Sequence, residues 1–147
     1  MNLKERITQD LKTAMKDQDK LRLATLRLAS SAITYMEKEK MRDLTDEELL
    51  AVVVREVKKR REAIVEYSKA GRTDLADKEQ AEANVLAAYM PEQMSDDEVE
   101  ALVKEVIAAT GASGPGDIGK VMGAVIPRTK GRADGKKINE VARGLLS

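Results

Sequence analysis

The sequence contains no cysteine and no histidine among its 147 residues. Without cysteine the chain can form neither disulfide bonds nor thiolate metal sites, and it has no cysteine nucleophile. Without histidine it lacks imidazole metal ligands and the base of most catalytic triads. We therefore expect no metal, no cofactor and no catalytic residues, and an enzyme is the least favoured class of function.

Aromatic residues are scarce, and charge of neither sign dominates. Three tyrosines are the only aromatic side chains, so the stacking platforms that bind single-stranded nucleic acid are not expected. The 26 basic and 26 acidic residues cancel, which excludes binding to polyanions through net charge alone. Residues 117–147 are nevertheless predominantly basic. Any nucleic-acid surface is therefore expected to be local and to recognise shape and phosphates, and no helix shows the pattern of a DNA-reading helix.

Long apolar runs are absent as well. The run at residues 49–54 is much shorter than the roughly 20 residues of a membrane span. The charged start, residues 1–10, lacks the apolar core of a secretory signal peptide. Together with the lack of cysteine, these features predict a cytoplasmic protein that does not enter a membrane.

Apolar residues recur at intervals of three and four along the whole chain, which predicts an all-α fold of about seven helices. The stripe of the first helix is Leu3, Ile7, Leu11 and Met15. The others are expected at about 21–37, 46–70, 74–90, 96–110, 118–126 and 134–146. Pro91 separates an N-terminal four-helix domain, residues 1–91, from a small C-terminal three-helix domain, residues 95–147.

Local signals place several helix ends. Thr45 with Glu48, and Ser95 with Glu98, have the spacing of capping boxes that start a helix. Pro127 is expected to kink or end the sixth helix. In the same helix the glycines at 119 and 123 have the four-residue spacing that is typical of closely packed helices.

Four stretches carry a family resemblance: Leu26-Arg27 with Ala32-Ile33, Tyr89-Met90-Pro91-Glu92-Gln93, Gly119-Lys120-Val121-Met122-Gly123, and Lys130-Gly131-Arg132-Ala133-Asp134-Gly135. Together they resemble YqeY-type proteins over essentially the full length of the chain. The C-terminal part is also similar to the tail domain of the transfer-RNA-dependent amidotransferase B subunit. Met90 and Met94 depart from the leucines expected there, although methionine fills core gaps much as leucine does.

The resemblance implies a recognition module rather than an enzyme. In the amidotransferase the tail domain helps to hold transfer RNA, whereas phosphorylation and amide transfer take place on a separate catalytic domain that this chain does not contain. A label of glutamine-dependent carbon–nitrogen ligase would therefore be inherited from larger members of the family. The resemblance implies a transfer RNA or another structured RNA as partner.

The first candidate site is the loop between the last two helices with its flanks. Its cations are Lys120, Arg128, Lys130, Arg132, Lys136 and Lys137. Gly131 and Gly135 would let a backbone approach closely, and the cations would neutralise phosphates. In the alternative interpretation the glycines serve turns and packing, Asp134 caps the last helix, and the lysines are merely solvated.

The second candidate is a basic ridge on the third helix. Its members are Arg55, Lys58, Lys59 and Arg61, with Arg60 in the same run. Ordinary ion pairing along a solvated helix explains such a run equally well. The acidic triplets at 46–48 and 96–98 could be read as catalytic carboxylates, but they occupy first turns, where they favour the helix dipole and complete capping boxes.

Three functions remain open on the sequence. The first is binding of structured RNA, most plausibly transfer RNA, through the C-terminal domain. The second is a protein-interaction adaptor that receives the helix of an unidentified protein partner. The third is an accessory of amidotransferase activity.

Overall fold

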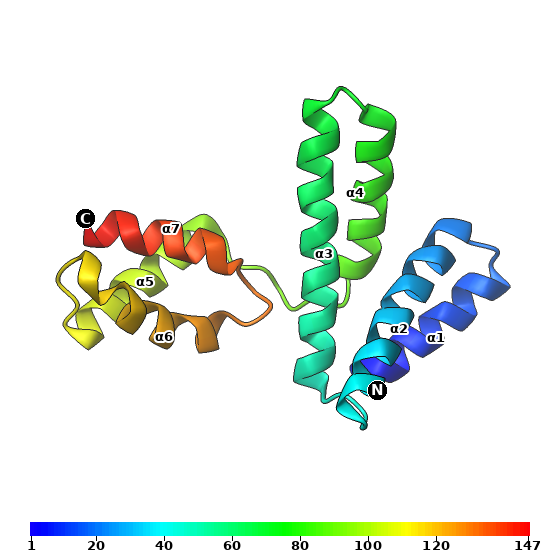
Figure 1. The fold of residues 1–147 in the computed structure, drawn as a ribbon, viewed down its shortest axis with the longest axis horizontal. Coiled ribbons are helices and arrows are strands. Elements are labelled where there is room, and N and C mark those ends of the chain that lie inside the picture. Colours follow the sequence, from blue (N-terminus) through cyan, green and yellow to red (C-terminus); the bar gives the residue numbers. More distant parts are fainter. The chain divides into compact units, whose positions relative to one another are not determined.

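The computed structural model describes residues 1–147 and is helical throughout (Figure 1). Its elements are α1 (Leu3–Lys16), α2 (Lys20–Lys40), α3 (Asp46–Lys69), α4 (Thr73–Ala87), α5 (Asp96–Thr110), the short 3₁₀ turn η1 (Pro115–Asp117), α6 (Ile118–Thr129) and α7 (Gly135–Leu146). The predicted all-α class with seven α-helices is confirmed. No helix combines the length and the apolar character that crossing a bilayer requires.

The chain divides into two compact units, Met1–Met90 and Pro91–Ser147. In the N-terminal unit the long helices α3 and α4 run side by side in opposite directions, and α1 lies beside α2 (Figure 1). One hydrophobic core joins these four helices. Its fully buried side chains include Ile7 of α1, Leu26 of α2, Leu49 and Val53 of α3, and Leu86 of α4.

The end of the N-terminal unit is fixed onto its first helix by Tyr89. The hydroxyl of Tyr89 donates a hydrogen bond to Oδ2 of Asp10 at 2.5 Å. The guanidinium of Arg6 lies 5.2 Å from the centre of the tyrosine ring. Burial, and then the hydrogen bond to Asp10, raise the pKa of Tyr89 above its ordinary value. The short stretch after α4 is thus held by its own side chain.

One predicted stripe is wrong at its last position. Met15 was placed on the apolar face of the first helix, yet its side chain is 52% exposed, and Ala14 is buried instead. Ile7 and Ala14 are seven residues apart, which is close to two helical turns, whereas Met15 lies one further step of about 100° around the helix. The small side chain of Ala14 allows α1 to approach its neighbours.

A partly buried ion cluster lies between α3 and α4. Arg60 is 7% exposed, and its Nη1 donates to Oε2 of Glu56 at 2.9 Å. Its Nε lies 3.6 Å from Oε2 of Glu82. Burial, and then the charge of Glu82, raise the pKa of the neighbouring Glu79. Arg60 is therefore an internal residue and does not belong to the basic ridge on the surface of α3.

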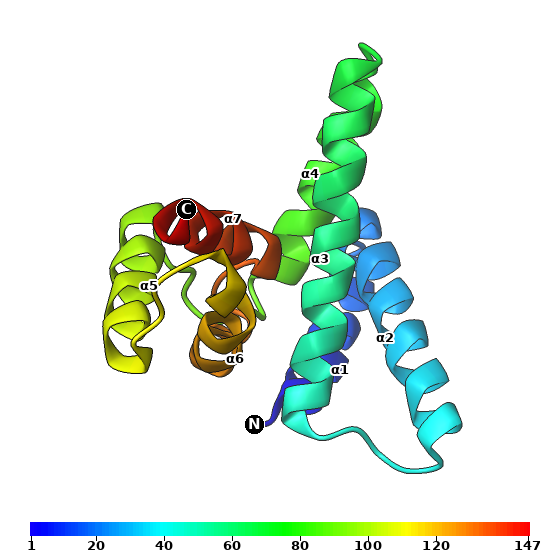
Figure 2. The same cartoon turned by 60° about the vertical axis from the view of Figure 1, so that its left-hand side comes forward.

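The C-terminal unit has a core of its own, formed where α5, α6 and α7 pack against one another (Figure 2). Val103, Val121, Val125, Ile138 and Ala142 are fully enclosed there. α5 ends at Gly111, whose φ of 70° lies in the left-handed region that favours glycine. The apolar stripes that the sequence predicts in these three helices thus meet in one small core.

Pro127 was expected to kink or end the sixth helix; an end at the proline is wrong, since α6 continues to Thr129, and the kink stays a prediction. Pro127 lies in the last turn of α6, so only two helical residues follow the place where proline interrupts the backbone hydrogen bonds. The hydroxyl of Thr129 donates to the carbonyls of Val125 and Ile126, both at 3.2 Å. The side chain of Thr129 thus adds two hydrogen bonds within the last turn of α6.

Candidate nucleic-acid interface

The solvent-exposed side of α6 carries two glycines and therefore has no side chain at these two positions. Gly119 and Gly123 are exposed, and no atom lies within 4 Å of the place where a Cβ would stand. The opposite side of α6 buries Val121, Val125 and Thr129. The predicted close helix packing at the two glycines is therefore wrong, because the fold leaves them facing solvent.

This bare surface continues to the start of α7. Ile126 lies three residues after Gly123, on the same side of α6, and is 37% exposed. Its Cδ1 is 3.8 Å from the place where a Cβ of Gly135 would stand. Gly119, Gly123 and Ile126 are called the α6 glycine face below. The exposed Lys120 follows Gly119 in the sequence, and the exposed Lys136 follows Gly135, the residue that Ile126 approaches.

The loop between α6 and α7 is tied to the segment that precedes α5. Gly131 has a φ of 71°, and the amide of Arg132 donates to the carbonyl of Thr129 at 2.8 Å, which closes a tight turn. The amide of Met94 donates to the carbonyl of Arg132 at 2.8 Å. Nε2 of Gln93 donates to the carbonyl of Gly131 at 2.7 Å. The loop is therefore held on both of its sides.

Arg132 has a structural role that the sequence did not predict. Its Nε donates to the carbonyl of Glu92 at 3.1 Å, and its side chain is only partly exposed. Arg132 thus helps to hold the 91–94 segment against the 130–134 loop. Its guanidinium is a poorer candidate for phosphate binding than the fully exposed lysines.

The structure separates the other predicted cations. Nη1 of Arg128 lies 3.5 Å from Oε1 of Glu105, and Nζ of Lys137 lies 3.8 Å from Oδ2 of Asp96. Both are exposed ion pairs, which stabilise a fold by little. Lys130 also has an interaction partner, whereas Lys120 lies in the first turn of α6, at the end of that helix away from the loop. Several cations of the loop and its flanks therefore have partners within the chain, and their role in RNA binding stays a prediction.

The start of α7 is capped by its own side chain. Oδ1 of Asp134 accepts from the amide of Lys136 at 3.4 Å. This carboxylate competes with any external anion for the first amides of α7. An anion at this place would therefore be bound by lysine side chains and not by the helix terminus.

Comparison with known proteins identifies the family. The model of a family described as Yqey-like protein matches residues 4–146. The chain belongs to the YqeY-like family. Among the relatives is "Altered inheritance of mitochondria protein 41, mitochondrial" of Pyrenophora tritici-repentis, which is 34% identical over 143 residues, covering 92% of this chain and 78% of that protein.

Two further YqeY-like relatives are fungal. An uncharacterized protein of Schizosaccharomyces pombe is 36% identical over 95 residues, which cover 65% of this chain and 77% of that protein. The protein of Kluyveromyces lactis that is also named "Altered inheritance of mitochondria protein 41, mitochondrial" is 34% identical over 112 residues, 74% of this chain and 60% of that protein.

These names contradict the predicted cytoplasmic location, because two of the relatives are mitochondrial by name. The prediction rested on the lack of cysteine and of a secretory signal peptide. Both properties argue against export through the secretory pathway. Neither distinguishes the cytosol from another reducing compartment.

The second predicted site of this YqeY-like chain is the basic ridge on α3, in which two of the lysines have interaction partners. Arg55 and Arg61 are exposed on α3, whereas Nζ of Lys59 lies 3.9 Å from Oε1 of Glu56 and Lys58 has a partner as well. The ridge is therefore an exposed helix surface on which some cations have partners, and its role in RNA binding stays a prediction.

The acidic triplets have the structural roles that their spacing predicts. The hydroxyl of Thr45 accepts from the amide of Glu48 at 3.2 Å, and the carboxylate of Glu48 accepts from the amide of Thr45 at 3.0 Å. Ser95 and Glu98 form the same reciprocal pair at the start of α5. No group of acidic residues is arranged to hold a metal ion.

Proposed function

We propose that this YqeY-like chain is an RNA-binding accessory protein whose C-terminal unit recognises structured RNA, in particular transfer RNA, without a catalytic step of its own. The resemblance of this unit to the tail domain of the amidotransferase B subunit supports the choice of transfer RNA. The α6 glycine face supports the place of binding.

The glycines of α6 carry the proposal, because the fold does not require them. A glycine inside a helix costs about 0.5–1 kcal/mol relative to alanine. At 119 and 123 a methyl group would meet no neighbouring atom, so alanine would fit. A bare helix surface instead lets a sugar–phosphate backbone approach the helix closely, with exposed lysines beside it for the phosphates.

The test combines Gly119→Ala with Gly123→Ala in the full chain. The double variant should unfold at a higher temperature, because about 1–2 kcal/mol of helix stability is gained. It should bind transfer RNA about tenfold more weakly, because two methyl groups hold the RNA away from the helix. Fluorescence anisotropy with labelled transfer RNA measures the second effect, and thermal unfolding followed by circular dichroism measures the first.

Gly144→Ala is the matched control. Gly144 is also an exposed glycine of a helix, α7, with no atom within 4 Å of a Cβ. It should raise stability in the same way and leave RNA binding unchanged. If the double variant binds transfer RNA as tightly as the intact chain does, the α6 glycine face is not the binding surface.

The lysines beside the face give an independent readout. Lys120→Gln with Lys136→Gln should lower the slope of log K against log salt concentration by between about 1 and 2, since each phosphate contact contributes roughly 0.9. Lys104→Gln, which removes a cation paired with Glu100 at 3.3 Å on α5, is the control. If the intact chain shows no preference for transfer RNA over a duplex of equal charge, the RNA function is rejected in favour of a protein-interaction adaptor.

A further inference from the structure

A second surface in the N-terminal unit consists only of hydrogen-bond donors and cations. It is a hollow of about 590 Å³ on the exposed side of α2. The residues that line it, called the α2 hydroxyl face below, are Arg27, Ser30, Ser31, Thr34, Tyr35 and Lys38.

Helical geometry explains why these side chains share one side of α2. Residues 27, 31, 34 and 38 follow at intervals of four and three, which is one side of an α-helix. Leu26, Ala29 and Ile33 occupy the opposite side and are buried in the core. Short hydroxyl side chains therefore lie between two long cationic ones whose Cα atoms are about 16 Å apart along the helix.

The charge of this face is uncompensated. The side chains of Arg27 and Lys38 are exposed, and neither forms an ion pair. Other cations of the same unit are paired: Nζ of Lys4 lies 2.9 Å from Oε2 of Glu37, and Nη1 of Arg42 lies 2.8 Å from Oε1 of Glu48. No carboxylate lines the hollow.

Neither acidic residue of α2 lines the hollow, but only Glu37 is engaged elsewhere, whereas Glu39 acts on Tyr35 of the face. Glu37 accepts from Lys4 and from the amide of Leu44, and Lys4 is the main cause of its lowered pKa. Glu39 lies one helical turn after Tyr35, and its carboxylate raises the pKa of the Tyr35 hydroxyl. Tyr35 itself is 63% exposed.

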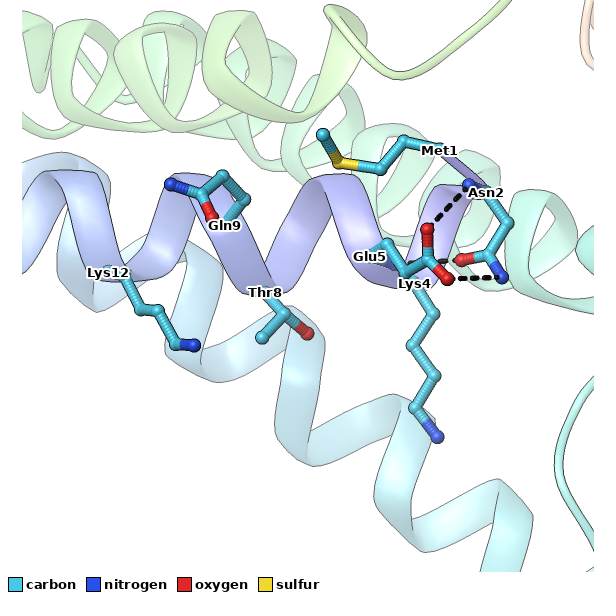
Figure 3. A pocket seen from close by; sticks show the side chains of 7 residues that line it. All are labelled: Met1, Asn2, Lys4, Glu5, Thr8, Gln9 and Lys12. Atoms are coloured by element: carbon cyan, nitrogen blue, oxygen red, sulfur yellow. Dashed lines mark hydrogen bonds between the residues drawn. The ribbon is translucent and has the colours of Figure 1, made fainter.

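The hollow at the start of α1 provides a contrast (Figure 3). It is lined by Lys4 and Lys12 but also by Glu5, whose carboxylate is bonded to Asn2 within the hollow. Lys4 is directed to Glu37 of α2. The mixed charge of that hollow makes it a poor anion site, whereas Arg27, Lys38 and the serine and threonine hydroxyls of the α2 hydroxyl face can all donate to an anion.

We propose that the α2 hydroxyl face binds the phosphodiester backbone of single-stranded nucleic acid. Phosphate oxygens are contacted mostly by arginine, lysine and hydroxyl side chains, which is the composition of this face. Three tyrosines form no extended stacking platform, but the exposed ring of Tyr35 gives one neighbouring base a surface for stacking. The proposal goes beyond RNA recognition by the C-terminal unit, because it concerns another unit and other residues.

An anionic membrane surface fits the face less well. Binding of a helix at a bilayer interface requires apolar side chains that enter the lipid next to the cations. No aliphatic side chain lines this hollow, and the apolar side of α2 is occupied by the core. Leu28, which follows Arg27, is 56% exposed, but a single leucine is not an apolar face. Vesicles of acidic phospholipid are therefore a comparison in the test and are not the expected ligand.

The experiment uses the full chain and a fluorescent oligouridylate of about twelve nucleotides, a length within the usual site size of single-strand binding proteins. Arg27→Gln with Lys38→Gln should weaken binding about tenfold and lower the salt slope by about 1.4, which corresponds to two phosphates of a single strand. Lys12→Gln with Lys16→Gln removes the same charge from exposed positions of α1 and should change neither quantity.

Two further variants separate contact from charge. Ser31→Ala with Thr34→Ala should weaken binding severalfold without changing the salt slope, because only neutral hydrogen bonds are lost. Tyr35→Leu should do the same through lost stacking. Circular dichroism should show unchanged helix content, since all three side chains are exposed on α2.

Three results would overturn the proposal. They are the absence of oligouridylate binding by the intact chain at low salt, an equal loss in the α1 control, and tighter binding to acidic vesicles that Arg27→Gln with Lys38→Gln abolishes. The Gly119→Ala and Gly123→Ala variant, which tests the C-terminal unit, should bind the oligouridylate normally. Failure of one proposal is thus distinguishable from failure of the other.

Discussion

Met41 ends α2 in a backbone conformation that suits glycine. Its φ of 58° and ψ of 34° lie in the left-handed region, and its amide donates to the carbonyls of the last turn. Residues other than glycine pay roughly 1–2 kcal/mol for this conformation. The side chain itself is 90% exposed, so it contributes little packing in return.

Met41→Gly should therefore stabilise the N-terminal unit by about 1 kcal/mol, after the greater entropy of glycine in the unfolded chain is deducted. Thermal unfolding should show a midpoint about 4 °C higher. Met15→Gly is the matched control, because Met15 is also exposed but lies within the regular helix α1. This substitution should lower the free energy of unfolding by about 1 kcal/mol. An equal loss in both variants would contradict the role of the left-handed conformation at position 41.

At the scale of elements, local sequence signals predicted helix starts well and helix ends and faces less well. The capping boxes at 45–48 and 95–98 form as predicted, because all their partners lie within one turn. Pro127 has a weaker effect than expected, since α6 continues for two residues beyond it, to Thr129. The exposed side of Gly119 and Gly123 could not be predicted, because spacing alone does not say whether a partner helix is present.

The pair of helices α3 and α4 gives a prediction with a pH dependence. The pKa of Glu79 is raised above its value in the unfolded chain, so the fold favours the protonated carboxyl. The corresponding stability is complete below the unfolded pKa of about 4.3 and is lost as the pH rises through the folded pKa. Glu79→Gln should therefore stabilise the protein at pH 7, and its effect should fade below about pH 4. Urea unfolding at several pH values measures this change.

Glu82→Gln is the informative comparison in the same helix. Oε2 of Glu82 lies 3.6 Å from Nε of Arg60. This Nε is buried and has no hydrogen-bond partner. Removing this carboxylate should destabilise the pair of helices by about 2 kcal/mol at pH 7, because a largely buried cation loses a counter-charge. If both glutamine variants change stability with the same sign at pH 7, the assignment of roles within the cluster is wrong.

At the scale of the whole molecule, the sequence predicted the number of helices and the apolar residues that form the two cores, because periodicity is a local property. It did not predict what holds the candidate site together. The bond from Gln93 to Gly131 spans 38 residues, and the bond from Arg132 to Glu92 spans 40. Contacts between residues so far apart in the sequence produce no periodic pattern. The sequence therefore predicts RNA binding for Arg132 but not its hydrogen bond to the carbonyl of Glu92.

The 91–94 segment decides where the C-terminal unit can be cut. The unit begins at Pro91, and Met94 packs against the core of α5, α6 and α7 while its amide bonds to Arg132. A fragment of residues 91–147 should therefore fold by itself, with helical circular dichroism and cooperative unfolding. Because its core is separate from that of the first four helices, the fragment should not require them.

A fragment of residues 95–147, which starts at the predicted domain boundary, should be less stable than the 91–147 fragment. It lacks the hydrogen bonds of Glu92, Gln93 and Met94 with the 130–134 loop, and it lacks the side chain of Met94. These losses amount to about 2 kcal/mol, or roughly 10 °C in the unfolding midpoint of so small a domain. Gln93→Ala in the longer fragment should reproduce a part of the loss. Equal midpoints for the two fragments would show that the segment does not stabilise the loop, and Arg132 would again be available for RNA.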